Sequence, residues 1–103
     1  MTTAIAKGKL DQLRERLKEI ILDTFPHVTF SNIWVVPRES FYGDLMIDIW
    51  SIYEGDLQQL HTPERYGLRT RLHDAIRDYG VDASPSPRFV LESEAGDWKP
   101  EGV

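Results

Sequence analysis

The sequence predicts one small α+β domain whose elements follow the order helix, strand, strand, helix, strand. Three observations support this fold class. An amphipathic stretch comes first, two β-rich stretches joined by a short loop follow it, and a second amphipathic stretch that begins at a proline precedes a last β-rich one. With 103 residues the chain can bury one core. We therefore expect a three-stranded mixed sheet packed with two helices.

The first half of the chain predicts a helix and a hairpin. Residues 4–24 are amphipathic at helical spacing, and Pro26 ends this helix because the residue before a proline is pushed out of the α region. Residues 28–36 and 44–53 are rich in β-branched and aromatic side chains, which is typical of strands. The loop between them is so short that we expect the two strands to pair antiparallel.

The second half predicts a helix and a third strand. We expect the helix over residues 63–79, with Thr62 as its N-cap and Gly80 in the left-handed conformation of a Schellman ending. We interpret residues 84–87, Ser-Pro-Ser-Pro, as a rigid connector and residues 88–92 as the third strand. Because a helix joins the second and third strands, these two strands should run parallel.

Composition narrows the domain organisation and the function classes. Residues 1–92 are expected to form the single domain, and residues 93–103 a loosely ordered acidic tail. The net charge of −5 disfavours a whole-surface attraction to nucleic acid or anionic lipid. The chain has no cysteine, no secretory signal and no apolar run near the ~20 residues of a bilayer helix. We therefore expect a cytoplasmic protein that does not bind membranes.

No catalytic, cofactor or metal constellation stands out. Asp44 and Asp48 fall on one face of the second predicted strand, but they stand ~13 Å apart at ~3.3 Å per residue, too far to share a metal. We interpret Asp44 as the end of a turn and Asp48 as a partly wet or edge position. The three histidines, His27, His61 and His73, lack metal-pair spacing and are expected at the surface. The sequence thus predicts no cofactor and no metal, and it gives no argument for an enzyme.

Neither face of the predicted sheet is clearly polar. Alternation along the second strand puts Met46, Trp50 and Ile52 on the face opposite Ile47. Because monomers rarely expose large apolar patches, the second face should be covered by a second copy, by a helix or the tail of the same chain, or by a ligand or partner. We favour a homodimer through the sheet or its edge. Its possible interface residues are Trp34, Met46, Trp50 and Ile52.

Basic side chains recur every fourth residue along the second predicted helix. The row consists of Arg65, Arg69, His73 and Arg77, and Arg88 extends it if this side chain projects to the same side. Such a row can bind a phosphate backbone or an acidic protein partner. The alternative, which we favour, is that the basic stems lie along the edge of the core with their charged heads in water.

The order of elements resembles the type II KH fold of ribosomal proteins and ribosome-assembly factors. This resemblance implies RNA binding through a Gly-x-x-Gly loop before the main helix, but residues 55–63 hold one glycine and no such loop. An extra turn over residues 57–60 would restore the helix count of that family. Our first hypothesis is a small non-catalytic interaction or accessory protein. The alternatives are a KH-like nucleic-acid-binding module that uses the basic row, and an enzyme with a pocket built from Asp48, His73 and the arginines.

Overall fold

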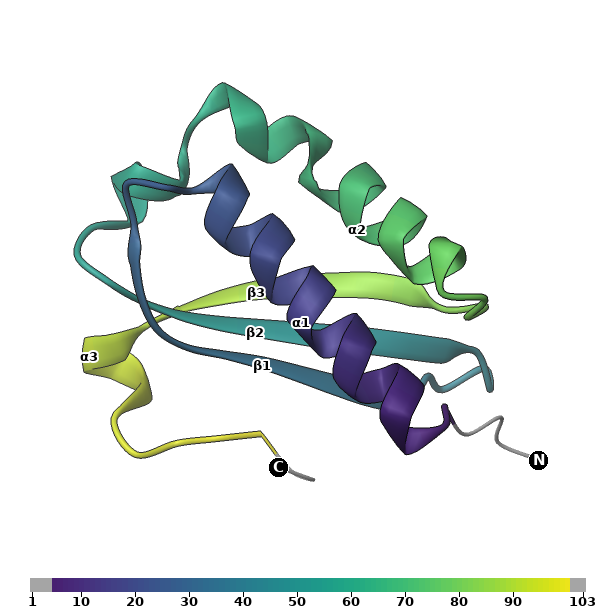
Figure 1. Cartoon of the computed structure of the whole chain (residues 1–103). Helices are drawn as coiled ribbons and strands as arrows, with labels where there is room; N and C mark the ends of the chain where they lie inside the picture. The colour runs from purple at the N-terminus through teal and green to yellow at the C-terminus, as the bar shows by residue number, and fades with distance from the viewer. Residues whose placement is uncertain (1–4, 101–103) are drawn as a thin grey trace.

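Two helices lie on one face of a three-stranded sheet in the computed structural model, which describes residues 5–100 (Figure 1). The elements are α1 (Lys7–Thr24), β1 (Thr29–Glu39), β2 (Leu45–Glu54), the 3-10 turns η1 (Leu57–Leu60) and η2 (Pro63–Gly67), α2 (Leu68–Asp78), β3 (Ser84–Leu91) and the short α3 (Glu92–Ala95). This order confirms the predicted α+β fold class, and η1 is the extra turn expected at residues 57–60. The predicted start of the first helix at residue 4 lies outside the described residues.

The sheet has the order β1-β2-β3, so β2 is its central strand. β1 and β2 pair antiparallel, with Trp34 opposite Trp50 and a bulge between Phe30 and Asn32. β2 and β3 pair parallel, with Trp50 opposite Arg88. Both pairings are as predicted, because a short loop joins the first pair and a helical connection joins the second.

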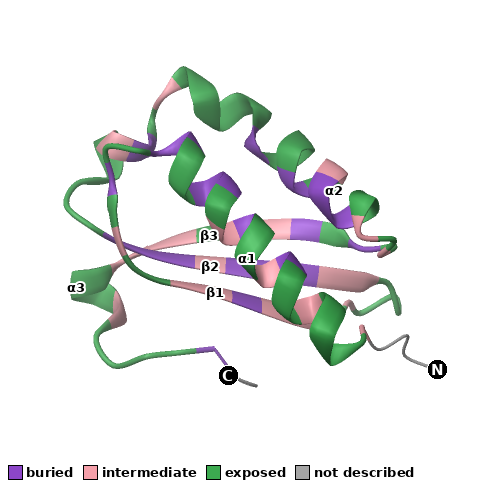
Figure 2. Ribbon diagram, in the orientation of Figure 1, coloured by how far each residue is buried: buried purple, intermediate pink, exposed green. Residues whose placement is uncertain are grey.

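The hydrophobic core lies between the sheet and the two helices. Figure 2 shows buried positions along the sides of α1 and α2 that face the strands. Fully buried side chains in this layer include Leu13, Leu17 and Ile21 from α1, Leu72 and Ile76 from α2, and Ile47 and Ile49 from β2. Since both helices cover the same face, the predicted alternative of one helix on each side does not hold. The opposite face needs another cover.

The second helix begins differently from the prediction. Residues 63–67 form the 3-10 turn η2, and Thr62 makes no capping hydrogen bond through its side chain. The reason is that the backbone N–H of Arg65 already donates to the carbonyl of Thr62 at 3.1 Å, so the hydroxyl is not used. The end of the helix confirms the Schellman prediction. Gly80 has a φ of +74°, and Val81 N donates to Ile76 O at 3.3 Å.

The third strand is longer than predicted, because residues 84–87 belong to it. The sequence interpretation of these residues as a connector is therefore wrong. β3 is an edge strand, and the carbonyl of Pro85 accepts a hydrogen bond at 3.2 Å from Arg69 Nη2 rather than from a strand. In a strand, the N–H and C=O of one residue point to the same side. Pro85 and Pro87 therefore face the outer edge of the sheet, where their missing N–H groups break no hydrogen bond between strands.

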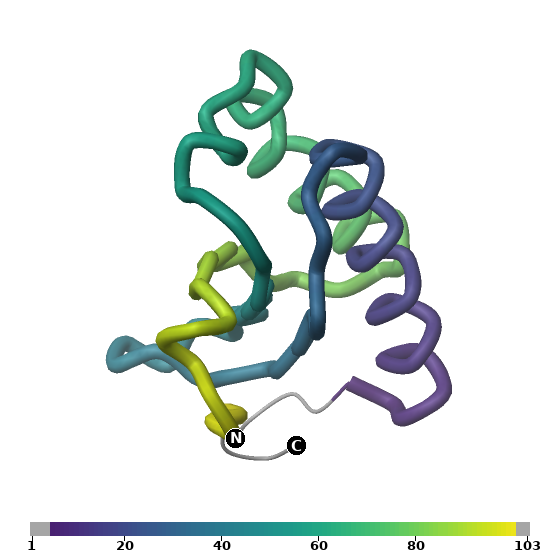
Figure 3. The backbone as a smooth tube through the Cα atoms, turned by 90° about the vertical axis from the view of Figure 1, so that its left-hand side faces the viewer, coloured from purple at the N-terminus to yellow at the C-terminus, as the bar shows by residue number. Residues whose placement is uncertain are grey.

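Residues 92–100, which we call the strap, fold back across the sheet on the side away from the helices. Figures 1 and 3, two views at right angles, agree on this placement. The strap begins with α3, and its Trp98 ring lies 5.0 Å from the ring of Trp50 in a T-shaped contact. Pro100 is buried. The predicted boundary between domain and tail falls within α3, and residues 101–103 lie outside the described residues.

Within residues 5–100, no helix has the length and apolar character needed to cross a membrane.

Candidate functional site

The candidate site is the face of the sheet opposite α1 and α2, which we call the open face. Strand register assigns its side chains. They are Asn32, Trp34, Val36 and Arg38 on β1, Met46, Asp48, Trp50 and Ile52 on β2, and Ser84, Ser86, Arg88 and Val90 on β3. Trp34, Trp50 and Arg88 form one row across the three strands. The four residues predicted as a possible interface thus share this face, because side chains alternate along a strand.

One end of the open face lies beneath the strap. Trp50 is held between two partners, because the guanidinium of Arg88 stands 4.9 Å from its ring centroid and the Trp98 ring packs against it edge-on. Arginine over a tryptophan face and edge-to-face aromatic pairs are both favourable contacts. Ile52 is only 4% exposed. This end is therefore covered from within the same chain.

The other end of the open face lies at the β1–β2 hairpin, and we call it the hairpin end. Val36 and Met46 are half-buried here. The loop beyond them carries Phe41 and Tyr42, which are 95% and 87% exposed and stack edge-on with ring centroids 5.4 Å apart. Asp44 closes this turn as predicted, because its carbonyl accepts from Ser40 N at 2.7 Å. Apolar side chains thus gather at the part of the face that is least covered.

A buried ion pair lies within the hairpin end, because Asp48 is opposite Val36 and Arg38 is opposite Met46. Asp48 is 6% exposed on the central strand, and its carboxylate accepts two hydrogen bonds from Arg38. Nε donates to Oδ2 at 2.7 Å and Nη2 donates to Oδ1 at 3.1 Å. These hydrogen bonds raise the pKa of the Arg38 guanidinium. The prediction of a partly wet or edge position for Asp48 is wrong, because sheet order puts β2 in the middle and Arg38 covers the carboxylate. The hairpin register was the signal that could have found this pair.

Both edges of the sheet are blocked by the chain itself. On β1, the carbonyl of Val35 accepts a hydrogen bond at 3.0 Å from Arg14 Nε, and Pro37, on the same side of the strand, has no N–H. On β3, Arg69 and the two prolines have the same effect. Edge strands modified in this way resist the addition of a further strand.

The first two members of the predicted basic row, Arg65 and Arg69, make contacts within the chain. Arg65 belongs to η2, not to α2, so the four-residue helical spacing does not reach it. Its guanidinium stands 5.6 Å from the centroid of the Phe89 ring. Arg69 donates to the carbonyl of Pro85. Both side chains therefore lie along β3, as in the alternative in which basic stems cover the edge of the core.

Arg69, His73 and Arg77 keep the predicted four-residue spacing along α2, and Arg69 and His73 line one shallow pocket. Arg77 Nη2 pairs with Asp74 at 3.0 Å on the same helix, and His73 is exposed. Arg88 lies on the open face over Trp50, the opposite side of the sheet from α2. The expectation that Arg88 could extend the row is wrong, because the β2–β3 register pairs it with Trp50. His27 and His61 are exposed, as predicted.

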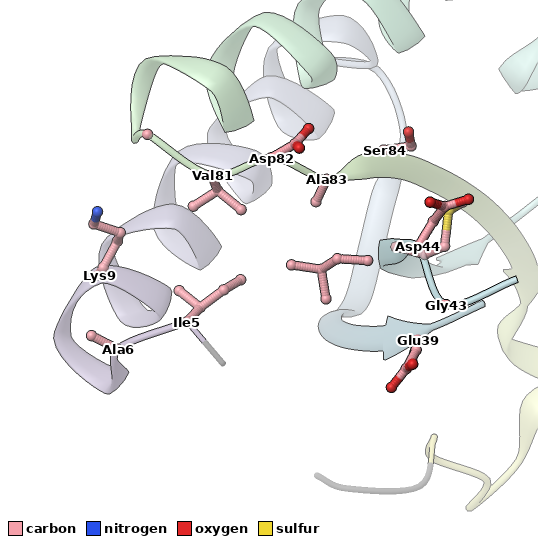
Figure 4. Close-up of a pocket in the computed structure, with 13 residues that line it drawn as sticks. Ile5, Ala6, Lys9, Glu39, Gly43, Asp44, Val81, Asp82, Ala83 and Ser84 are labelled. Atoms are coloured by element: carbon pink, nitrogen blue, oxygen red, sulfur yellow. The ribbon is translucent and has the colours of Figure 1, made fainter. Parts of the chain in front are cut away.

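A cleft of about 690 Å³ opens beside the hairpin end, between the start of α1, the end of α2 and the β1–β2 loop (Figure 4). Charged side chains around it are Lys9, Glu39, Asp44 and Asp82. Its lining residues include no histidine. Across residues 5–100, no cluster of three or more histidine or acidic side chains is arranged to hold a metal. Asp48 and His73, the centre of the enzyme hypothesis, do not line this cleft.

Comparison with known proteins gives no match, since no family model, no curated protein and no solved structure is significantly similar to this chain. The resemblance to the type II KH fold therefore rests on the order of the elements alone.

Proposed function

We propose that this chain is a small non-catalytic interaction module that forms a homodimer through the hairpin end of its open face. The observation that carries the proposal is the gathering of half-buried and exposed apolar side chains at that end. The residues are Val36, Phe41, Tyr42 and Met46. Monomers rarely expose contiguous apolar patches, and aromatic residues, methionine and arginine are enriched in protein interfaces.

The remaining surfaces of the sheet are less suited to a partner. The helices occupy one face, and arginine contacts and prolines block both edges. Pairing through the hairpin end of the open face leaves all these contacts intact. The proposal therefore narrows the expected dimer from the sheet or its edge to one end of one face.

A second copy is the partner that the charges of this face favour. Arg38 and Asp48 neutralise each other within the hairpin end, so two such ends can approach without burying an unpaired charge there. The chain as a whole carries a net charge of −5, so contact between copies is opposed least where charges neutralise each other locally, as Arg38 and Asp48 do. In a twofold dimer the same patch of each copy contacts the other, so the patch must be complementary to itself. An apolar patch without net charge is complementary to itself.

The test measures molar mass against concentration by size-exclusion chromatography with light scattering. One chain has a mass of 11.9 kDa, and we expect the mass to rise toward twice this value as concentration increases. Met46→Lys should keep the chain monomeric, because it would bury an ammonium group in the interface. Leu22→Lys is the matched control, because Leu22 is 50% exposed on α1, away from the open face. A wild-type chain that stays at 11.9 kDa at millimolar concentration would overturn the proposed function.

A further inference from the structure

The contact between the strap and the sheet leaves part of the strap's apolar surface exposed to solvent. Trp98 is still 45% exposed, although its ring packs against Trp50. Trp50 and Arg88 form the receiving surface, which we call the socket. A large aromatic side chain that leaves nearly half of its surface in water keeps apolar area that a neighbouring molecule can bury.

The short connection before Trp98 allows the end of the strap to leave the sheet in another direction. α3 has only four residues, and it ends at Gly96, whose φ is +55°. A side chain built on Gly96 would meet no atom within 4 Å, so the space around this turn is open. Glycine also takes many backbone conformations at low cost. Gly96 is therefore a position at which the strap can change direction without disturbing the sheet.

Negative charge surrounds the root of the strap. The carboxyl groups of Glu92 and Glu54 share a hydrogen bond, and this contact raises the pKa of Glu92. On the helix side of the same end, burial raises the pKa of the Tyr53 hydroxyl, and the carboxylates of Glu94 and Asp56 raise it further. Once Glu92 and Glu54 are ionised, their repulsion acts at α3, the root of the strap, and not at the turn of Gly96.

We propose that the two straps exchange in the homodimer, so that Trp98 of each copy packs into the socket of the other. This inference rests on the proposed function. The strap lies on the same face as the proposed interface, so in a face-to-face dimer it lies between the two sheets or beside the partner's socket. Exchange of an identical segment forms the same contacts again and is a low-cost route to a dimer. It adds to the hairpin-end contact a tryptophan anchor of the kind that dominates binding energies.

The test is complementation between two variants of the full chain, each damaged on one side of the contact. Trp98→Ala removes the anchor, and Trp50→Leu removes the socket ring while it keeps the strand apolar. If the contact forms between chains, each variant alone should dimerise on the order of tenfold more weakly than the wild type, or worse. An equimolar mixture should recover part of the loss, because the heterodimer contains one intact anchor in one intact socket. Arg88→Ala is a second socket variant, on an exposed side chain, if Trp50→Leu does not fold.

Tyr66→Ala is the matched control, because Tyr66 is an aromatic residue that is 93% exposed on η2, on the helix side, and its removal should leave dimerisation unchanged. Dimerisation that is unchanged or stronger in Trp98→Ala would overturn the exchange while the proposed function stands. Two weakened variants whose mixture shows no recovery would place the contact within one chain and overturn the exchange as well. A wild-type chain that never dimerises would instead remove the proposed function itself.

Discussion

The two faces of β2 come from alternate residues of the same ten-residue strand, yet they are built in different ways. Toward the helices, Ile47, Ile49 and Tyr53 are at most 2% exposed and pack in a continuous apolar layer. Toward the open face, Asp48 is held by an ion pair and Trp50 by a cation and an aromatic edge. The first face is a core, whereas the second combines local pairs with surface that is still accessible.

This difference predicts that the two faces contribute unequally to the stability of the fold. A core of interlocked aliphatic side chains is sensitive to the loss of single methylene groups. A face held by an ion pair and an arginine–tryptophan contact tolerates rearrangement, and arginine and aromatic residues are the types enriched where proteins meet. Mutations on the two sides of the strand should therefore affect different measurements.

The largest effect on folding is expected on the helix side. Ile49→Ala should lower the free energy of unfolding by about 2–5 kcal/mol, because it leaves a cavity under both helices. Val36→Ala is the matched change on the open face and should cost about 1 kcal/mol or less in the monomer, because Val36 is only half-buried. Urea unfolding at a concentration that keeps the chain monomeric measures both. Equal losses would show that the two faces do not differ as we describe.

The next effect concerns the ion pair on the open face, and its two partners should not be equivalent. Arg38→Ala leaves the Asp48 carboxylate buried without its partner, which should cost about 2–3 kcal/mol. Asp48→Asn should cost about 1 kcal/mol, because the Arg38 side chain is 42% exposed and can be hydrated. Urea unfolding of both variants, with the double variant to complete the cycle, gives the coupling energy. A larger loss of unfolding free energy for Asp48→Asn than for Arg38→Ala would contradict the view that Asp48 is the more buried partner.

Local patterns were enough to predict the order and pairing of the elements. Alternation, short loops and the Gly80 ending depend on neighbours in sequence, and the structure confirms them. The error at residues 84–87 has a different origin. Prolines exclude a segment from the middle of a sheet but not from its edge, and the position of β3 at the edge depends on long-range pairing. The unused hydroxyl of Thr62 likewise follows from a 3-10 first turn that its sequence does not specify.

The candidate site was predictable only in part, for the same reason. Period-two alternation alone is enough to assign Trp34 and Trp50 to one face. It did not predict that Arg88 would stand over Trp50, because that contact requires the β2–β3 register. It also did not predict that Arg14 would block the edge of β1, because this depends on how α1 lies over the sheet. Contacts between distant elements, rather than composition, define the free part of the open face.

The smallest expected effect is a pH dependence of the strap, and it tests whether the covered end of the open face can be uncovered. The pKa of Glu92 is raised by its hydrogen bond to Glu54, so α3, which carries the strap, favours the protonated carboxyl group in its folded position. This contribution is fully present below the ordinary pKa of glutamate, about 4.3, and it is lost as pH rises through the raised value. The indole NMR signal of Trp98, assigned with Trp98→Phe, should therefore indicate a more solvent-exposed ring as pH rises through that range.

Glu92→Gln should flatten this pH dependence, because the amide keeps a hydrogen bond to Glu54 without a second negative charge. Glu94→Gln is the matched control on α3, since Glu94 lies on the same short helix and takes no part in the hydrogen bond that raises the pKa of Glu92. Its pH profile should follow the wild type. A strap that loosens as pH falls would contradict the sign of the effect. A wild-type profile without any pH dependence would mean that the Trp50–Trp98 contact holds the covered end of the open face without a contribution from the carboxyl pair.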